Sequence, residues 1–334
     1  MLYFVNTIKN NSNCKKFIYM KFTILHSTEK DSPLLSLSLL MIGILVLSLQ
    51  DSLIKLFSSE TSFWQIQSLR SFFNLILLYL ISQFTIGRKE LLPKNWKPVY
   101  LRGFIMTCCM FCFFSASPSL NISQMAAGLY TFPLFVTILA FFFSKEIIGV
   151  WRLTALLIGS IGGALVLEPW DHDFKLVQFL PILAGFFYAC NIILIRKFCR
   201  DESPLSLTFA VGVMFFISGV FGIIFLEFLY DFNEIFFDMP FITIGWPKLT
   251  IYIFLFAIFC SILNVIGNLS LAKAYQNAES SWLAPLDYSY LLMACIWGKI
   301  IFDTWPNSIN LIGILLISFG GVLIAYREHV KKVV

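Results

Sequence analysis

Long apolar segments alternate along this chain with short polar connections. Each segment has about 20 residues, enough for a helix to cross a hydrocarbon core of about 30 Å. Strand-like alternation is not their pattern, and an isolated strand would leave its backbone groups unpaired in lipid. The segments lie at 34–57, 63–86, 99–117, 124–143, 151–168, 176–195, 205–229, 249–272, 280–301 and 308–326. They predict an all-α integral membrane protein with ten transmembrane helices.

Composition supports lipid as the solvent. Of the 334 residues, 58% are hydrophobic and only 13% are charged, whereas soluble domains keep about a quarter of their residues charged. A water-soluble fold could not bury so much apolar surface. The lipid bilayer is therefore an expected partner of this chain.

The two ends of the chain are polar. Residues 1–33 are basic and contain no apolar core of the kind that a cleavable signal peptide needs, so they predict an N-terminal tail in the cytoplasm. Residues 327–334 predict a short C-terminal tail on the same side.

Lysines and arginines fall mainly on one side of the predicted topology. That side also carries both termini, so the positive-inside rule puts the termini in the cytoplasm and the protein in the inner membrane. The opposite side has Lys175 and Lys248 but many more carboxylates. Topology thus accounts for the net charge of +5, and no nucleic-acid partner is expected.

The two halves of the chain resemble each other. The pair Gly162-Gly163 matches Gly320-Gly321, the segment 130–146 matches 287–303 in length, and 52–57 resembles 193–198 more weakly. The pattern predicts two five-helix repeats, 34–168 and 176–326. Because five is odd, the second repeat must insert upside down relative to the first, an architecture typical of secondary transporters.

One phrase is similar to a known family. LAKAYQNAESSWLAPLDYSYLLMACIWGKIIFDTWP (271–306) resembles the closing half of EamA-type transporters of the drug/metabolite transporter superfamily, with Asp303 where that family usually has Glu. Segments 50–57, 100–104 and 132–146 look like the corresponding parts of the first half. The resemblance implies a ten-helix carrier with a central cavity. Family members export amino acids and metabolites, or import compounds such as S-adenosylmethionine or riboflavin.

The best candidate for a substrate site lies after Pro285. Asp287 would suit a cationic or amine-bearing cargo, with Tyr288, Tyr290 and Trp282 as aromatic walls. Tyr130 holds the equivalent position in the first repeat and is expected on the opposite wall. The alternative is that Asp287 is hydrated near a helix end and that the aromatic residues are core.

Several ionisable residues lie inside predicted helices, among them Asp51, Lys55 and Arg70, and each costs roughly 2.5–3.5 kcal/mol at a helix centre on insertion scales. Asp51 and Lys55 are one helical turn apart, so they form a neutralising pair or serve in gating or coupling. Arg70 either binds an anionic group of the substrate or snorkels or pairs with Asp51.

Three asparagines and one lysine–aspartate pair are the remaining polar candidates. Asn191, Asn264 and Asn268 either contact substrate or form hydrogen bonds between helices. Lys299 is expected to pair with Asp303. Gly159 and Gly163 form a GxxxG pattern that predicts a close helix contact.

The leading functional hypothesis is a secondary transporter that moves a small polar metabolite, such as an amino acid or S-adenosylmethionine, by alternating access. No Gly-rich phosphate loop points to an ATP-driven pump. A membrane-embedded enzyme is the first alternative, but His26, His172 and His329 lie outside the predicted spans. A channel is the second, although no filter sequence is evident. No cofactor and no metal are expected, and a homodimer is left open.

Overall fold

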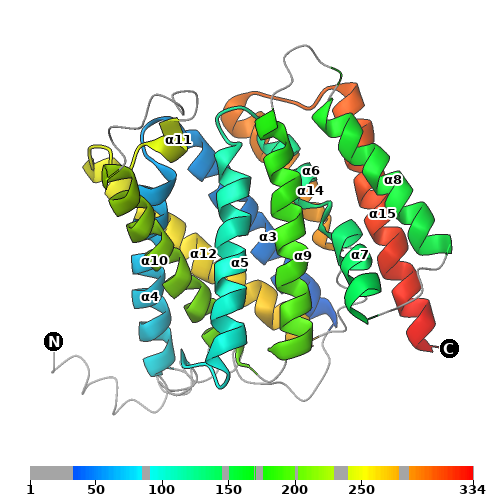
Figure 1. Ribbon diagram of the computed structural model, residues 1–334, viewed down its shortest axis with the longest axis horizontal. Helices are drawn as coiled ribbons and strands as arrows, with labels where there is room; N and C mark the ends of the chain where they lie inside the picture. Colours follow the sequence, from blue (N-terminus) through cyan, green and yellow to red (C-terminus); the bar gives the residue numbers. More distant parts are fainter. Residues whose placement is uncertain are drawn as a thin grey trace.

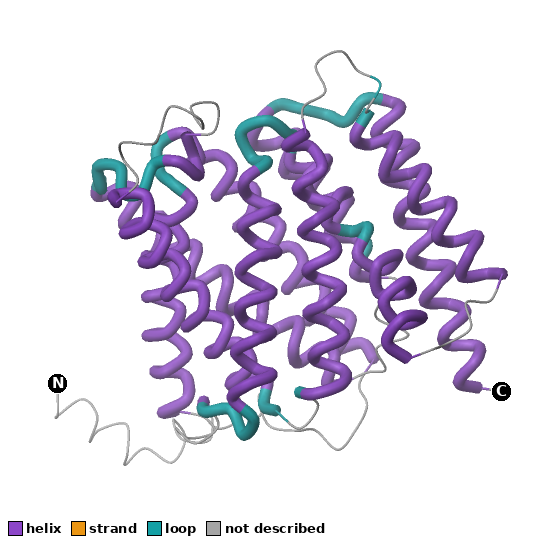
Figure 2. Tube along the Cα trace, in the orientation of Figure 1, coloured by secondary structure: helices purple, strands orange, loops and turns teal. Residues whose placement is uncertain are grey.

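The computed structural model describes residues 33–84, 91–144, 150–168, 170, 176–199, 202–228, 240–277 and 286–333. The predicted N-terminal tail and Trp282 lie outside these residues. Within them every regular element is a helix, and no strand occurs (Figure 2).

The helices stand side by side as a bundle (Figure 1). The long ones are α3 (Pro33–Leu56), α4 (Phe63–Phe84), α5 (Trp96–Ser115), α6 (Ile122–Leu129), α7 (Phe132–Ser144), α8 (Val150–Leu167), α9 (Leu180–Phe198), α10 (Pro204–Phe228), α12 (Ile251–Asn277), α14 (Ser289–Phe302) and α15 (Ser308–Val333). Short turns of helix are η2 (Phe57–Ser59), η4 (Leu176–Phe179) and α11 (Pro240–Thr243). The start of α3 and the end of α15 lie at the same end of the bundle (Figure 1).

Six described stretches are long and apolar enough to cross a membrane. They are Leu34–Ser59, Trp96–Ser115, Ile122–Leu139, Leu176–Ile195, Pro204–Phe228 and Ile251–Leu271. The shorter apolar helices are Leu153–Leu167, Ser289–Phe302 and Ser308–Leu323. Helix α4 has 22 residues, but Gln65, Gln67, Arg70 and Asn74 lower its hydropathy.

The outer face of the bundle is apolar. On α10, Ile217, Phe221, Ile224 and Phe228 recur at helical spacing and are 52–86% exposed. Polar side chains lie inside instead, among them Gln50, Gln67 and Arg70, each at most 2% exposed. This inversion of the soluble pattern is what lipid requires of the surface.

The predicted helix over 124–143 is interrupted, which corrects the sequence-based expectation of one continuous span. Helix α6 ends at Leu129, and α7 begins at Phe132. Pro133 has no N–H to donate to the preceding turn. Thr131 instead donates from its hydroxyl to the carbonyl of Gly128, at 2.7 Å. The break therefore sits at Tyr130 and Thr131, inside the bundle.

The other end of the chain also differs from expectation. Helix α15 continues to Val333, so residues 327–333 extend the last helix beyond the predicted end of the span near 326. Sequence explains the extension, because the segment from 327 to 333 contains neither Gly nor Pro.

The first two helices of each half of the chain pack against helices of the other half. Helix α3 packs on α12 and α14, and α9 packs on α5, α6 and α7. Helix α4 packs on α12, and α10 packs on α5. The remaining main contacts join α4 to α10 and α8 to α15.

Glycines allow α8 and α15 to approach closely. A Cβ added at Gly162 would lie 2.7 Å from the carbonyl oxygen of Gly313, and one at Gly320 would lie 3.0 Å from that of Ala155. The GxxxG residue Gly159 is also at this contact, with its backbone nitrogen 3.3 Å from the Cβ position of Gly320. Gly159 therefore takes part in the predicted close helix contact, but Gly163 of the same GxxxG pattern does not, since a Cβ there would meet Thr131 Cγ2 at 3.6 Å.

Candidate functional site

Three tyrosines meet where two helices are interrupted. Tyr130 follows the end of α6, and Tyr288 precedes α14, which carries Tyr290. The Tyr130 ring stacks on Tyr290, with centroids 5.2 Å apart, and meets Tyr288 edge-on at 5.6 Å. We call these three residues the tyrosine cluster. The sequence led us to expect Tyr130 on the opposite wall of a site, and in the structure its ring is in direct contact with Tyr288 and Tyr290.

Glycine makes room for this cluster. The hydroxyl of Tyr288 would lie 1.6 Å from a Cβ at Gly321 of α15, so no other residue type fits there without moving the ring. The same hydroxyl is buried and has no hydrogen-bond partner within the described residues. A buried unsatisfied hydroxyl is costly, and its position beside Tyr130 makes it a candidate contact for a bound molecule.

Asp51 lies beside the tyrosine cluster. The hydroxyl of Tyr290 donates to its Oδ2 at 2.6 Å, and Nε2 of Gln50 donates to its Oδ1 at 3.0 Å. Asp51 and Arg70 of α4 attract each other electrostatically, but no ion pair within 4.0 Å joins these two described residues. The predicted lock between Asp51 and Arg70 is therefore not a direct contact.

Arg70 is held by its own set of neighbours. Its Nη2 donates to Oε1 of Gln67 at 2.7 Å, and the guanidinium lies 5.8 Å from the ring centroid of Phe215 on α10. Its backbone carbonyl accepts a hydrogen bond from Ser261 of α12 at 2.7 Å. With the side chain 2% exposed, Arg70 is buried and does not snorkel to the interface.

Asp287 is partly exposed at the start of the segment that carries Tyr288. It interacts electrostatically with Tyr288 and with Tyr188 of α9. Tyr188 packs edge-on against Phe132 at 4.9 Å. Asp287 thus belongs to the surroundings of the tyrosine cluster, while Trp282 cannot be placed because it lies outside the described residues.

Lys55 does not pair with Asp51, which corrects the neutralising-pair alternative. Its Nζ donates to the carbonyl of Ser117, between α5 and α6, and lies 5.5 Å from the ring centroid of Phe302 on α14. The i, i+4 spacing allowed a local pair, but each side chain finds partners on other helices. Lys55 joins three segments at the end of the bundle opposite to the termini.

The candidate asparagines divide into two groups. Oδ1 of Asn264 accepts a hydrogen bond from Asn74 of α4 at 3.1 Å, and Asn268 donates to the carbonyl of Asn264 at 2.9 Å. The first contact supports the interhelical alternative for Asn264, whereas Asn268 bonds within its own helix, which neither alternative predicted. Asn191 on α9 is buried, and its Oδ1 has no partner within the described part of the chain.

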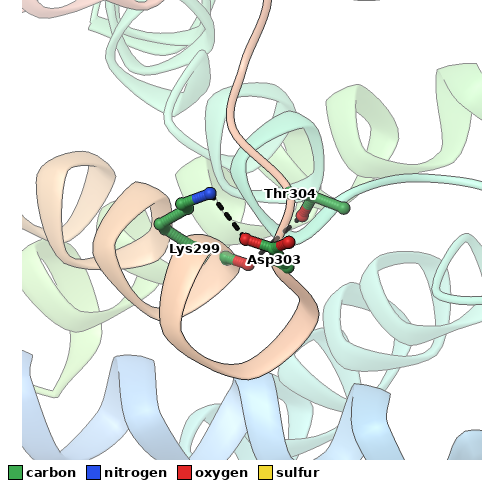
Figure 3. A network of polar contacts seen from close by, with 4 residues as sticks. Lys299, Asp303 and Thr304 are labelled. Carbon is green, nitrogen blue, oxygen red and sulfur yellow. Dashed lines mark hydrogen bonds and ion pairs between the residues drawn. The ribbon is translucent and has the colours of Figure 1, made fainter.

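The predicted Lys299–Asp303 pair is confirmed, with 2.5 Å between Nζ and Oδ1 (Figure 3). Asp303 adopts a left-handed conformation at the end of α14, and Thr304 donates from its backbone to the carbonyl of Gly298 at 3.1 Å. The backbone N–H of Asp303 also donates to the carbonyl of Lys299 at 3.1 Å, the bond of an αL-type helix end. The neighbouring Lys299 lowers the pKa of Asp303 below its usual value. Both side chains are more than half exposed, so the pair ends the helix and lies apart from the tyrosine cluster.

The sequence of this chain matches a known protein family. The model of the EamA-like transporter family matches residues 34–168 and 175–326. The chain belongs to this family. The resemblance seen in the sequence is thereby confirmed, and the EamA-like chain stands among transporters rather than enzymes.

Individual relatives are distant. A riboflavin transporter of Vibrio cholerae is 29% identical over 212 residues, which cover 63% of this chain and 64% of that protein. An S-adenosylmethionine uptake transporter of Rickettsia bellii is 27% identical over 202 residues, 60% of this chain and 62% of that protein. Both alignments therefore span less than two thirds of the relative. An uncharacterized transporter of Helicobacter pylori is 24% identical over 307 residues, 91% and 98% of the two chains.

A solved crystal structure superimposes with a TM-score of 0.55 at 16% identity, covering 87% of this chain and 98% of the other. At this identity the likeness concerns the fold alone. Together with the spans, the family membership makes the EamA-like chain a multi-pass protein of the inner membrane.

Sequence reasoning missed three polar residues of the site. Gln50 and Gln67 stand next to charged candidates, and Tyr188 is one helical turn before Asn191. The signal for the glutamines was available, because Gln67 and Arg70 are spaced i, i+3 on one helix. Within the described residues no group of three His, Cys, Asp or Glu side chains could hold a metal ion. What the site offers is aromatic surface, two carboxylates, one guanidinium and several amide atoms without a described partner, a set suited to binding a polar molecule.

Proposed function

We propose that this EamA-like protein is a secondary transporter that moves a small polar metabolite across the inner membrane by alternating access. The tyrosine cluster, Asp287 and Asp51 form the core of its substrate site. The observation that carries this proposal is the meeting of Tyr130 and Tyr288, repeat-equivalent residues, at helix interruptions inside the bundle. Interrupted helices at the interface of two repeats are where secondary transporters bind their substrates.

The transporter has ten transmembrane helices in two inverted repeats, 34–168 and 176–326, with both termini in the cytoplasm. The contact between α8 and α15 supports this architecture. Gly162 meets Gly313, while Gly320 meets Ala155; a shift of 158 residues, which aligns Gly162 with Gly320, also turns Ala155 into Gly313. One contact is therefore the repeat image of the other, as across a two-fold axis. Their order along the helices is antiparallel, as inversion requires.

Hydrogen bonds at the two ends of the bundle also support the inversion. In the first repeat, Ser62 and Trp64 donate to carbonyls of Gly245 and Ile242, each at 2.8 Å, near the start of α12. In the second, Glu202 accepts from the backbone N–H of Asn95, just before α5, at 2.7 Å. Each repeat thus holds the start of the other's third helix, at opposite ends.

Relatives bear on the cargo. Those named for riboflavin and for S-adenosylmethionine uptake both carry small polar molecules, and a small polar substrate agrees with the polar atoms around the tyrosine cluster. A channel is the alternative, and saturable exchange separates the two, because a carrier binds one substrate per cycle.

The test is counterflow in proteoliposomes with radiolabelled amino acids, S-adenosylmethionine, riboflavin and nucleotide sugars. We expect saturable exchange of at least one compound, reduced by Asp287→Asn but unchanged by Glu227→Gln, a matched control because Glu227 is exposed on α10. Equal loss in both variants, or none in either, would discard Asp287 as a site residue. Absence of exchange would reject the carrier. Light scattering of the purified protein tests the homodimer.

A further inference from the structure

Hydrogen-bonding atoms without a described partner lie next to both Asp51 and Arg70. The one next to Asp51 is an acceptor, and those next to Arg70 are donors. The amide of Gln50 uses its Nε2 to donate to Asp51, which leaves Oε1 as a buried acceptor without a partner in the described residues. The amide of Gln67 uses its Oε1 to accept from Arg70, which leaves Nε2 as a buried donor without one. Each charged residue therefore fixes the orientation of its neighbouring amide.

Arg70 adds to the donor side. Its Nε is also buried and has no partner among the described side chains. Arg70 Nε and Gln67 Nε2 are thus two unused donors attached to one positive charge. On the other side, the carboxylate of Asp51 accepts two hydrogen bonds, from Gln50 and Tyr290, and a carboxylate can accept about four. Asp51 and Gln50 Oε1 are therefore unused acceptors attached to one negative charge.

The two charges attract each other without forming an ion pair within 4.0 Å. Arg70 is buried and Asp51 is partly buried, and charges inside a membrane protein that are incompletely paired are costly and mark functional positions. Both residues sit in the half of their helix that is remote from the chain termini, since Asp51 is near the end of α3 and Arg70 is near the start of α4. A molecule that offers both an ammonium group and a carboxylate would satisfy both sides at once.

On the basis of the proposed function, we infer that the cargo is a zwitterion of the α-amino acid type, held between Asp51 with Gln50 and Arg70 with Gln67. The substrate ammonium donates to the Asp51 carboxylate and to Oε1 of Gln50. The substrate carboxylate accepts from Nε of Arg70 and Nε2 of Gln67. The tyrosine cluster, attached through Tyr290, lies on the Asp51 side and takes the remainder of the molecule. An α-amino acid with an uncharged side chain leaves the net charge of the site unchanged, because it is neutral overall, whereas S-adenosylmethionine adds the positive charge of its sulfonium.

The zwitterion site distinguishes the cargoes to be tested by the charged groups that they carry. Amino acids and S-adenosylmethionine carry an α-ammonium and a carboxylate, whereas riboflavin carries neither. An analogue that lacks one of the two groups leaves one charged residue of the protein unpaired. A lost hydrogen bond to a charged group costs about 10- to 100-fold in affinity.

The experiment measures competition for counterflow in proteoliposomes containing the full chain. The probe is the amino acid or S-adenosylmethionine that exchanges. For an amino acid the competitors are its carboxamide, which lacks the carboxylate, and its α-hydroxy acid, which lacks the ammonium; for S-adenosylmethionine the competitor is 5′-methylthioadenosine. We expect each analogue to compete at least about tenfold more weakly than the parent.

Two variants assign the ends. Asp51→Asn should remove the discrimination against the hydroxy acid while retaining that against the carboxamide, and Arg70→Gln should do the reverse. Such a crossed result requires two separate contacts with one ligand. The wild-type analogue series keeps the test decisive where a variant fails to fold, which size-exclusion chromatography reports.

The outcomes separate this inference from the proposed function. Exchange of riboflavin but of no zwitterion, or equal competition by parent and analogues, would overturn the zwitterion site and leave the carrier standing. A crossed pattern in the reverse sense would overturn the assigned ends. Absence of exchange by any compound would overturn the carrier and the zwitterion site together.

Discussion

The hydroxyl of Tyr290 on α14 donates a hydrogen bond to the carboxylate of Asp51 on α3, with 2.6 Å between the two oxygens. Because α3 and α14 are far apart in the sequence, this bond joins distant segments in the interior of the bundle. Among the described residues Asp51 has one other hydrogen-bond partner, Gln50, so the position of the carboxylate depends on Tyr290.

Tyr290→Phe is expected to destabilise the protein by about 1–3 kcal/mol, because the variant removes a hydrogen bond to a charged group and leaves the carboxylate short of a donor. The phenyl ring retains the stacking on Tyr130. Thermal unfolding in detergent, followed by the fraction of protein that survives size-exclusion chromatography, measures the change. An unfolding midpoint equal to that of the wild type would show that the bond does not hold Asp51.

Tyr288→Phe should behave in the opposite way. The hydroxyl has no partner in the described residues, so its removal should leave the unfolding midpoint unchanged or raise it. If the hydroxyl contacts the cargo, the same variant lowers substrate affinity by about tenfold, measured as the concentration that half-saturates counterflow. Unchanged half-saturation would assign Tyr288 to packing alone. The pair of variants thus separates a structural hydroxyl from a substrate-binding one within the same cluster.

Sequence predicted the helices well because lipid imposes a simple rule. A membrane span must be a long apolar helix, so its hydropathy identifies it even without information on packing. Helix α4 follows the rule less closely, since Gln65, Gln67, Arg70 and Asn74 reduce its apolar character. Those same side chains form hydrogen bonds inside the bundle, so the weakest span by composition is among the richest in polar contacts.

The parts that sequence did not predict are those decided by contacts between distant segments. The i, i+4 spacing allowed Asp51 to neutralise Lys55. The carboxylate of Asp51 instead accepts a hydrogen bond from Tyr290, 239 residues away. The interruption at Tyr130 and Thr131 was also missed, because prolines occur within continuous membrane helices when neighbours satisfy the freed backbone. Here the hydroxyl of Thr131 donates to the carbonyl of Gly128, which also accepts from the backbone N–H of Thr131. Neither outcome follows from hydropathy, which contains no information on partners.

Lys55→Met tests the gating or coupling role of Lys55. The lysine amine contacts the Ser117 carbonyl and the Phe302 ring, and methionine keeps most of the length of the side chain but loses the hydrogen bond and the positive charge. We expect a lower maximal rate of counterflow with little change in half-saturation, because the contact joins α3, α14 and the segment between α5 and α6 at the end of the bundle opposite to the termini and does not involve the tyrosine cluster. Lys55→Arg, which retains the charge, is the matched control. A change in half-saturation alone would instead assign Lys55 to substrate binding.

Gly162 and Gly163 are neighbours in sequence but face different environments, which makes them a matched pair. A Cβ at Gly162 would lie 2.7 Å from the carbonyl oxygen of Gly313 and 2.9 Å from the backbone nitrogen of Ile317. Backbone atoms cannot rotate away as a flexible side chain can, so Gly162→Ala must push α8 from α15. A Cβ at Gly163 meets only Thr131 Cγ2, at 3.6 Å. That distance is ordinary van der Waals contact.

Gly162→Ala should therefore destabilise the protein by about 1–3 kcal/mol, the usual cost of overpacking. Gly163→Ala should be neutral or slightly stabilising, since alanine favours the helix over glycine by about 1 kcal/mol. Thermal unfolding of both variants in the same detergent gives the comparison. Equal midpoints would mean that α8 and α15 separate without cost, and the contact between Gly162 and Gly313 could then not be what holds these two helices together.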